Sequence, residues 1–192
     1  MEKCRFHRIN KKLTLCSRAR HRDSMLTKND FSPSDWNTLR DCQYLVGLAT
    51  LMAGSSGLGT IKESIAIAQS VMENQSSNLP FVRDLTSKTE MQAAQNSLKQ
   101  RLGGPNAKPT AESLQSSALD QVRASISILS RNASQEESDA YRKMIYGVAE
   151  KVANAASEGG FLGFGGTRIS SGEQTFLDEL RSTLQLERVN KA

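Results

Sequence analysis

Histidine is nearly absent from this chain. Both histidines, His7 and His21, lie within the first 21 of the 192 residues. Residues 22–192 therefore have no imidazole for a Ser-His-Asp or Cys-His arrangement, for a Glu-x-x-His di-metal bundle or for a histidine zinc site. Because the commonest acid–base side chain is missing, an enzyme is the least favoured class, and we predict no catalytic residue.

Cysteine and long apolar runs are also scarce. Cys4, Cys16 and Cys42 are an odd number without a C-x-x-C pair, unlike the disulfide framework of a secreted protein. The longest weakly polar stretch, residues 44–54, is too short to span a membrane. The N-terminus also lacks the continuous apolar segment of a secretory signal. These absences predict a cytoplasmic protein with no membrane span.

The positive charge is concentrated at one end of the chain. Residues 1–30 hold nine lysines and arginines against three acidic residues, whereas residues 31–192 hold 16 basic and 17 acidic residues. Attraction to nucleic acid is therefore expected only of the N-terminal segment. Because this segment has few apolar residues, we predict a disordered basic leader over residues 1–30. Two alternatives are an organellar transit peptide and a natural start at Met25.

The leader also gathers metal-ligand side chains. Cys4, His7, Cys16 and His21 lie within 18 residues and form a ligand set suited to tetrahedral zinc. The interleaved arginines and lysines would contact phosphates. Nucleic-acid binding through a zinc knuckle is thus an alternative function, beside the simpler interpretation of a disordered extension.

Six helix starts are predicted from residue 31 onward. Five have a hydroxyl residue three positions before an acid or amide, so that both side chains satisfy free backbone N–H groups as a capping box. These boxes begin at Ser32, Thr60, Thr89, Ser134 and Ser170, and a sixth start is Pro109–Thr110. Apolar residues follow each start at helical spacing. The pattern predicts an all-α fold.

The expected architecture is a single compact bundle of about six helices over residues 31–188, with a glycine-rich loop before the last helix and a tail at 189–192. Small residues mark the long helix after Ser134. They are Gly147, Ala149, Ala153 and Ala156. We predict that they let a neighbouring helix approach closely and that this helix lies centrally in the bundle.

The segment 158–170 is the most unusual part of the chain. Its glycines permit positive φ and exposed amides, which could form an anion nest at the start of the last helix, and its arginine could bind phosphate or carboxylate. No strand precedes it, so it is neither a dinucleotide fingerprint nor a P-loop. The predicted contact residues are Gly159, Gly160, Phe161, Leu162, Gly163, Phe164, Gly165, Gly166 and Arg168. The alternative is a connector whose apolar side chains cover the bundle end.

Carboxylates near this segment suggest a second kind of site. Glu158 and Glu173, with Glu150 and nearby hydroxyls, offer oxygen ligands suited to calcium or magnesium, although no EF-hand spacing is present. Glu173 also has a sufficient role as a capping residue. A divalent cation bound by Glu158 and Glu173 is therefore an alternative to a protein without a cofactor.

One stretch resembles a known group of proteins. Gly166, Ile169, Ser170 and Glu173, together with the Glu-Gly-Gly-Phe-Leu-Gly sequence at 158–163, resemble tellurite-resistance B-like (TerB-like) helical proteins and some uncharacterised bacterial proteins over about 45 residues. The resemblance implies a bacterial cytoplasmic helical protein, and it supplies the alternative of a metal- or anion-binding, stress-associated function.

The leading hypothesis is a non-enzymatic binding protein. Its contact surface is expected at residues 158–170, where an exposed apolar loop would dock an unidentified protein partner. The composition and the motifs do not indicate a substrate or a biological process.

Overall fold

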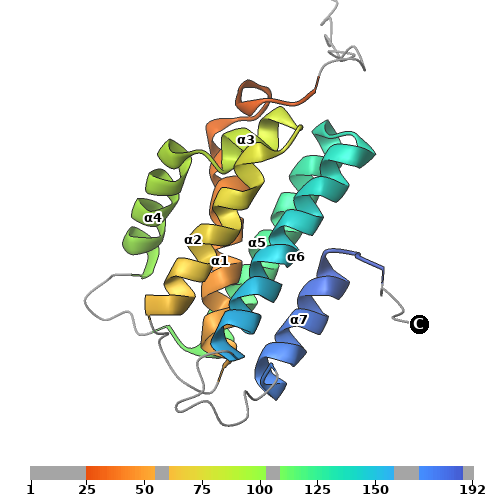
Figure 1. The fold of residues 1–192 in the computed structure, drawn as a ribbon. Helices are drawn as coiled ribbons and strands as arrows, with labels where there is room; N and C mark the ends of the chain where they lie inside the picture. Colours follow the sequence, from red (N-terminus) through yellow and green to blue (C-terminus); the bar gives the residue numbers. More distant parts are fainter. Residues whose placement is uncertain (1–24, 55–60, 103–108, 158–168, 188–192) are drawn as a thin grey trace, which may run out of the picture.

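The computed structural model describes residues 25–54, 61–102, 109–157 and 169–187, which form seven α-helices, two 3-10 turns and no strand. The elements are η1 (Lys28–Asp30), α1 (Pro33–Ala53), α2 (Ile61–Glu73), η2 (Asn74–Ser76), α3 (Pro80–Leu85), α4 (Lys88–Leu102), α5 (Ala111–Asn132), α6 (Gln135–Ser157) and α7 (Ser171–Thr183). Figure 1 shows one bundle with α4 at one edge and α7 at the other. The predicted all-α fold is confirmed.

Four helices begin where the capping residues predict. The hydroxyls of Ser32, Thr110, Ser134 and Ser170 each accept a hydrogen bond from the backbone N–H three residues later. A cap of this kind satisfies a donor that the first helical turn leaves free. The starts of α1, α5, α6 and α7 therefore follow from local side-chain chemistry.

Two features of the segment before α4 differ from the prediction. The helix begins at Lys88, and Ser87, rather than Thr89, caps it by accepting from the Glu90 N–H at 3.4 Å. The short helix α3, with Pro80 at its first position, has no capping box and was not predicted. A six-residue helix is too short to show a periodic apolar stripe.

Helix α1 lies at the centre of the bundle. Its buried residues face all directions, which is typical of a helix that neighbours cover on every side. It packs most extensively against α5, then α6, and also contacts α2, α4 and α7. At the α2 contact, a Cβ on Gly47 would lie 2.9 Å from Ile67 Cγ1, so Gly47 allows a close approach. The central helix is therefore α1, and α6, for which a central position was expected, packs beside it.

The folded part begins before the predicted boundary at residue 31. Leu26 is buried in the main hydrophobic core, and its N–H donates to Glu137 Oε1 at 2.6 Å. The other carboxylate oxygen of Glu137 accepts from the backbone N–H and the hydroxyl of Ser134. Residues 25–30 therefore belong to the bundle, because one capping residue also anchors the preceding segment.

The small residues of α6 have different roles. Ala149 and Ala153 are fully buried, as expected for helix packing. Gly147 differs from the prediction, because a Cβ at this position would have no atom of the described residues within 4 Å. No neighbouring helix therefore requires glycine there. Among the described helices, none combines the length and the apolar character that crossing a membrane requires.

Candidate functional site

Most of the predicted site residues lie outside the described residues. These are the zinc-knuckle residues Cys4, His7, Cys16 and His21, and Glu158, Gly159, Gly160, Phe161, Leu162, Gly163, Phe164, Gly165, Gly166 and Arg168 of the glycine-rich segment. The zinc site, the docking loop and the pairing of Glu158 with Glu173 therefore stay predictions.

Glu173 is the predicted metal ligand that the structure describes. Its Oε2 accepts from the Ser170 N–H at 2.9 Å and from the Ser170 hydroxyl at 2.8 Å, which completes the capping box. Its Oε1 is buried beside Gly54 and has no hydrogen-bond partner among the described residues. Within the same residues, no group of three or more His, Cys, Asp or Glu side chains is placed to hold a metal ion.

A buried ionic network joins α1, α4 and the N-terminal segment. Arg40 donates from Nε to Asp41 at 2.7 Å and from Nη1 to Glu90 at 3.4 Å. Lys28 donates to the other oxygen of Glu90 at 2.5 Å, and Ser97 donates to Asp41 at 2.6 Å. Each buried charge thus has an opposite charge beside it, as the low dielectric of the interior requires.

The network holds Glu90 in its ionised form. Burial by itself would raise the pKa of Glu90, but the hydrogen bonds from Lys28 and Arg40 outweigh it and hold the pKa below its ordinary value. Glu90 belongs to a Ser-x-x-Glu sequence, so local pattern alone suggests a capping role. Its partners Arg40 and Lys28 lie 50 and 62 residues away, and no sequence signal pairs them.

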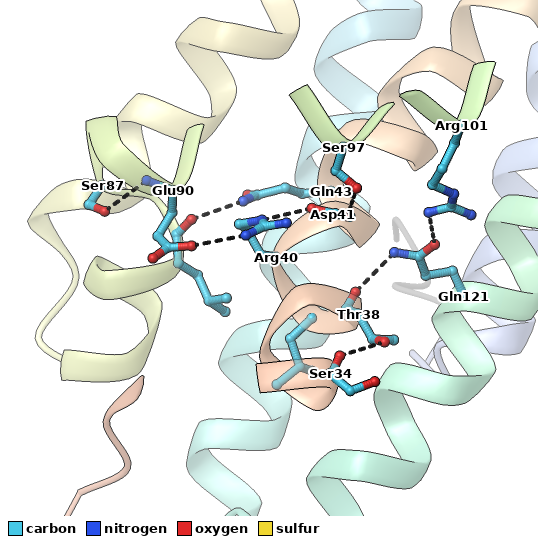
Figure 2. A network of polar contacts seen from close by, with 12 residues as sticks. Ser34, Thr38, Arg40, Asp41, Gln43, Ser87, Glu90, Ser97, Arg101 and Gln121 are labelled. Atoms are coloured by element: carbon cyan, nitrogen blue, oxygen red, sulfur yellow. Dashed lines mark hydrogen bonds and ion pairs between the residues drawn. The ribbon is translucent and has the colours of Figure 1, made fainter. Parts of the chain in front are cut away.

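A polar cleft of about 530 Å³ lies next to this network, between α1, α4 and α5. Figure 2 shows hydrogen bonds among the residues that line the cleft. Arg101 donates to the side-chain oxygen of Gln121 at 2.9 Å, and the Gln121 amide donates to the Thr38 carbonyl at 3.0 Å. Asp41 at its edge already accepts from Arg40 and Ser97. Asp41 and Gln121 are thus already hydrogen-bonded to other groups of the protein.

A second hollow, the α6–α7 groove, has a volume of about 650 Å³. It lies between the outer face of α6 and the C-terminal end of α7, the two helices at one side of the bundle in Figure 1. Its lining includes Arg142, Lys143, Tyr146 and Gly147 of α6 and Arg181 and Gln185 at the end of α7. Its volume is in the range of small-molecule sites.

Arg181 and Tyr146 join the two walls of the groove. The guanidinium Nη2 donates to the Tyr146 hydroxyl at 2.5 Å, and the Arg181 Cζ lies 4.5 Å from the centre of the Tyr146 ring. The hydrogen bond from Arg181 to Tyr146 raises the pKa of Arg181 further above neutral pH. A permanent positive charge therefore lies across the groove from Arg142 and Lys143.

Two residues of the groove depart from the residue type that their backbone conformation prefers. Gly147 lies in the middle of α6, where glycine is less favourable than alanine by about 0.5–1 kcal/mol, and no neighbour restricts a Cβ there. Gln185 has a φ of 56°, a left-handed conformation that costs most residues about 1–2 kcal/mol. Glycine is the usual residue at such a helix end.

Two buried side chains, Cys42 and Tyr141, are poorly suited to nucleophilic chemistry. Cys42 is completely buried, and burial raises the pKa of its thiol to about 11, so the reactive thiolate is scarce at neutral pH. Burial likewise raises the pKa of Tyr141, whose hydroxyl donates to the Leu39 carbonyl at 3.0 Å. Both side chains serve the core.

Comparisons with family models, curated proteins and solved structures gave no match to this chain. The TerB-like resemblance therefore stays a prediction.

Proposed function

We propose that this chain is a binding protein that acts without catalysis and holds its ligand or partner in the α6–α7 groove. One observation carries the proposal. The walls of the groove contain both Gly147, whose missing side chain no described neighbour requires, and Gln185, a non-glycine residue at the left-handed position that closes α7. Departures from local preference are expected where function, rather than stability, selects the residue.

Gly147 contributes directly to the shape of the groove. A side chain at this position would project into open space, because no atom lies within 4 Å of its Cβ position. The missing side chain thus helps to keep the hollow open for an occupant. The C-terminal end of α7 forms the other wall of the groove.

Replacing each of these two residues by the residue type that its backbone conformation prefers should stabilise the protein. We expect Gly147→Ala and Gln185→Gly each to raise the free energy of unfolding, by about 0.5–1 kcal/mol and about 1 kcal/mol, respectively. Chemical denaturation of the full chain measures both effects. A loss of stability in either variant would show that a contact requires the original residue, and it would contradict the proposed function of the groove.

Blocking the groove tests the function. The full chain and its Gly147→Trp variant are purified gently from the cells that naturally produce it and compared by native mass spectrometry. We expect the wild-type chain to retain a bound species that the variant lacks, because the indole occupies the groove without meeting a neighbouring atom at its Cβ. Melting curves confirm that the variant is folded.

Ala124→Trp is the matched control. Ala124 is exposed on α5 and lines the polar cleft, so the substitution adds the same side chain to the other hollow. We expect this variant to retain the bound species. Loss of that species from Ala124→Trp but not from Gly147→Trp would place the binding surface in the cleft and contradict the proposal.

A further inference from the structure

We infer that the α6–α7 groove binds an oxyanion, a carboxylate or a phosphoryl group, through the guanidinium of Arg142. This inference rests on the proposed function of the groove and specifies the chemistry of its occupant. The groups that carry it are Arg142 and its two cationic neighbours, Lys143 on the same helix and Arg181 on the opposite wall.

Arg142 is a largely buried cation with unused donors. Its side chain is 16% exposed, and its Nε is buried without a hydrogen-bond partner among the described residues. Its Nη1 lies 3.8 Å from Asp139 Oδ1, which is too long for a hydrogen bond. Arg40, which is buried to a similar degree, has two carboxylates within 3.4 Å. The Arg142 guanidinium therefore has an ion-pair partner in Asp139 but no carboxylate within hydrogen-bond distance among the described residues.

A planar guanidinium binds a carboxylate or phosphate through two parallel hydrogen bonds, and this geometry suits Arg142 at the wall of an open groove. Lys143 and the permanently charged Arg181 add to the local positive potential. Gly147, five residues along α6, leaves space for the rest of the ligand.

The carboxylates of the groove leave most of the Arg142 guanidinium without a hydrogen-bond partner. Asp139 forms an ion pair with Arg142 at 3.8 Å, is 42% exposed, and accepts a hydrogen bond from the Gln135 amide at 2.9 Å. Glu187 is also exposed. Glu150 lies eight residues from Arg142 on the same helix, a rise of about 12 Å along the axis. Positions 142 and 143 thus carry two cations beside one carboxylate, that of Asp139, and this local excess of positive charge favours an oxyanion at Arg142.

The polar cleft does not offer an equivalent site. Its arginine, Arg101, is exposed and already donates to Gln121, which in turn donates to the backbone of α1. The Arg101 guanidinium is therefore solvated, whereas the Arg142 guanidinium is largely buried and its Nε has no hydrogen-bond partner among the described residues.

The test is a ¹H–¹⁵N NMR titration of the full chain with inorganic phosphate and, separately, with citrate at constant ionic strength. We expect at least one anion to cause saturable shifts of the Arg142 Nε–Hε and Gly147 amide signals. Arg142→Met should weaken this binding roughly 10- to 100-fold, because it removes charged hydrogen bonds. Arg142→Lys should weaken it less, because it keeps the charge but loses the two-pronged geometry.

Arg123→Met is the matched control. Arg123 pairs with Asp120 at the same i, i+3 spacing as Arg142 with Asp139, but the Arg123–Asp120 pair is well exposed on α5. The Arg123→Met substitution should leave anion binding unchanged. A response to phosphate alone identifies a phosphoryl ligand, and a response to citrate alone identifies a carboxylate. Arg142→Lys keeps the test decisive if Arg142→Met does not fold.

Two results would overturn the inference: no saturable shift with either anion, or shifts that both Arg142 variants leave unchanged. The proposed function fails separately. If Gly147→Trp loses its bound species while neither anion binds, the groove remains the binding surface and its ligand is not an oxyanion. If Gly147→Trp retains the species, the groove itself is not the surface.

Discussion

Replacement of Arg40 by methionine is expected to lower the free energy of unfolding by about 4 kcal/mol. The guanidinium lies between Asp41 and Glu90, at 2.7 Å and 3.4 Å, and all three side chains are buried. Removing the central cation leaves two carboxylates in the interior with fewer partners. Because solvation cannot replace the lost interactions there, the loss is larger than for a surface pair. Urea denaturation near neutral pH measures it.

Arg123→Met is again a suitable control, because the exposed pair of Arg123 and Asp120 should contribute less than about 1 kcal/mol. A loss below about 1 kcal/mol for Arg40→Met would show that the network adds little to stability. Combining Arg40→Met with Glu90→Gln should destabilise less than the sum of the two changes, since the second removes a charge that the first leaves with Lys28 alone as its cationic partner in the network.

The effect of Arg40→Met should also depend on pH. The pKa of Glu90 is lower in the folded chain than in the unfolded chain, where it is about 4.3. The ionised carboxylate therefore stabilises the fold fully above that value, and this contribution is lost as pH falls through the folded pKa. We expect the difference in the free energy of unfolding between the wild-type chain and Arg40→Met to become smaller below about pH 4.

Gly172→Ala is expected to destabilise the protein by about 2 kcal/mol. Gly172 lies in the first turn of α7, where this helix meets the end of α1, and a Cβ there would lie 2.4 Å from the Ala53 carbonyl oxygen. Because the obstacle is backbone rather than a flexible side chain, α7 must shift away from α1. Denaturation measures the loss of stability, and faster amide hydrogen exchange in α7 would locate it.

The same substitution at Gly147 provides the control with the opposite expected sign. Gly147→Ala meets no atom within 4 Å and should stabilise α6, whereas Gly172→Ala should loosen α7. Since α7 forms one wall of the groove, Gly172→Ala should also weaken binding there. Equal gains in stability at both positions would show that the close contact between α1 and α7 is absent in solution.

Helix starts are the part of this fold that sequence reasoning predicts best. Ser32, Thr110, Ser134 and Ser170 cap helices as expected, because a cap joins a side chain to a backbone N–H three residues away. The apolar stripes predicted the all-α class for a similar reason, since the helical period depends on neighbours along the chain.

The candidate site could not be predicted in this way. Glu90 belongs to a local capping sequence, yet its carboxylate binds Arg40 and Lys28 from distant parts of the chain. Gly147 has the sequence signature of a tightly packed helix, yet it faces open space. One stripe of apolar or small residues is compatible with several helix packings. Which face of α6 is covered, and which lines a groove with α7, depends on long-range contacts that leave no local pattern.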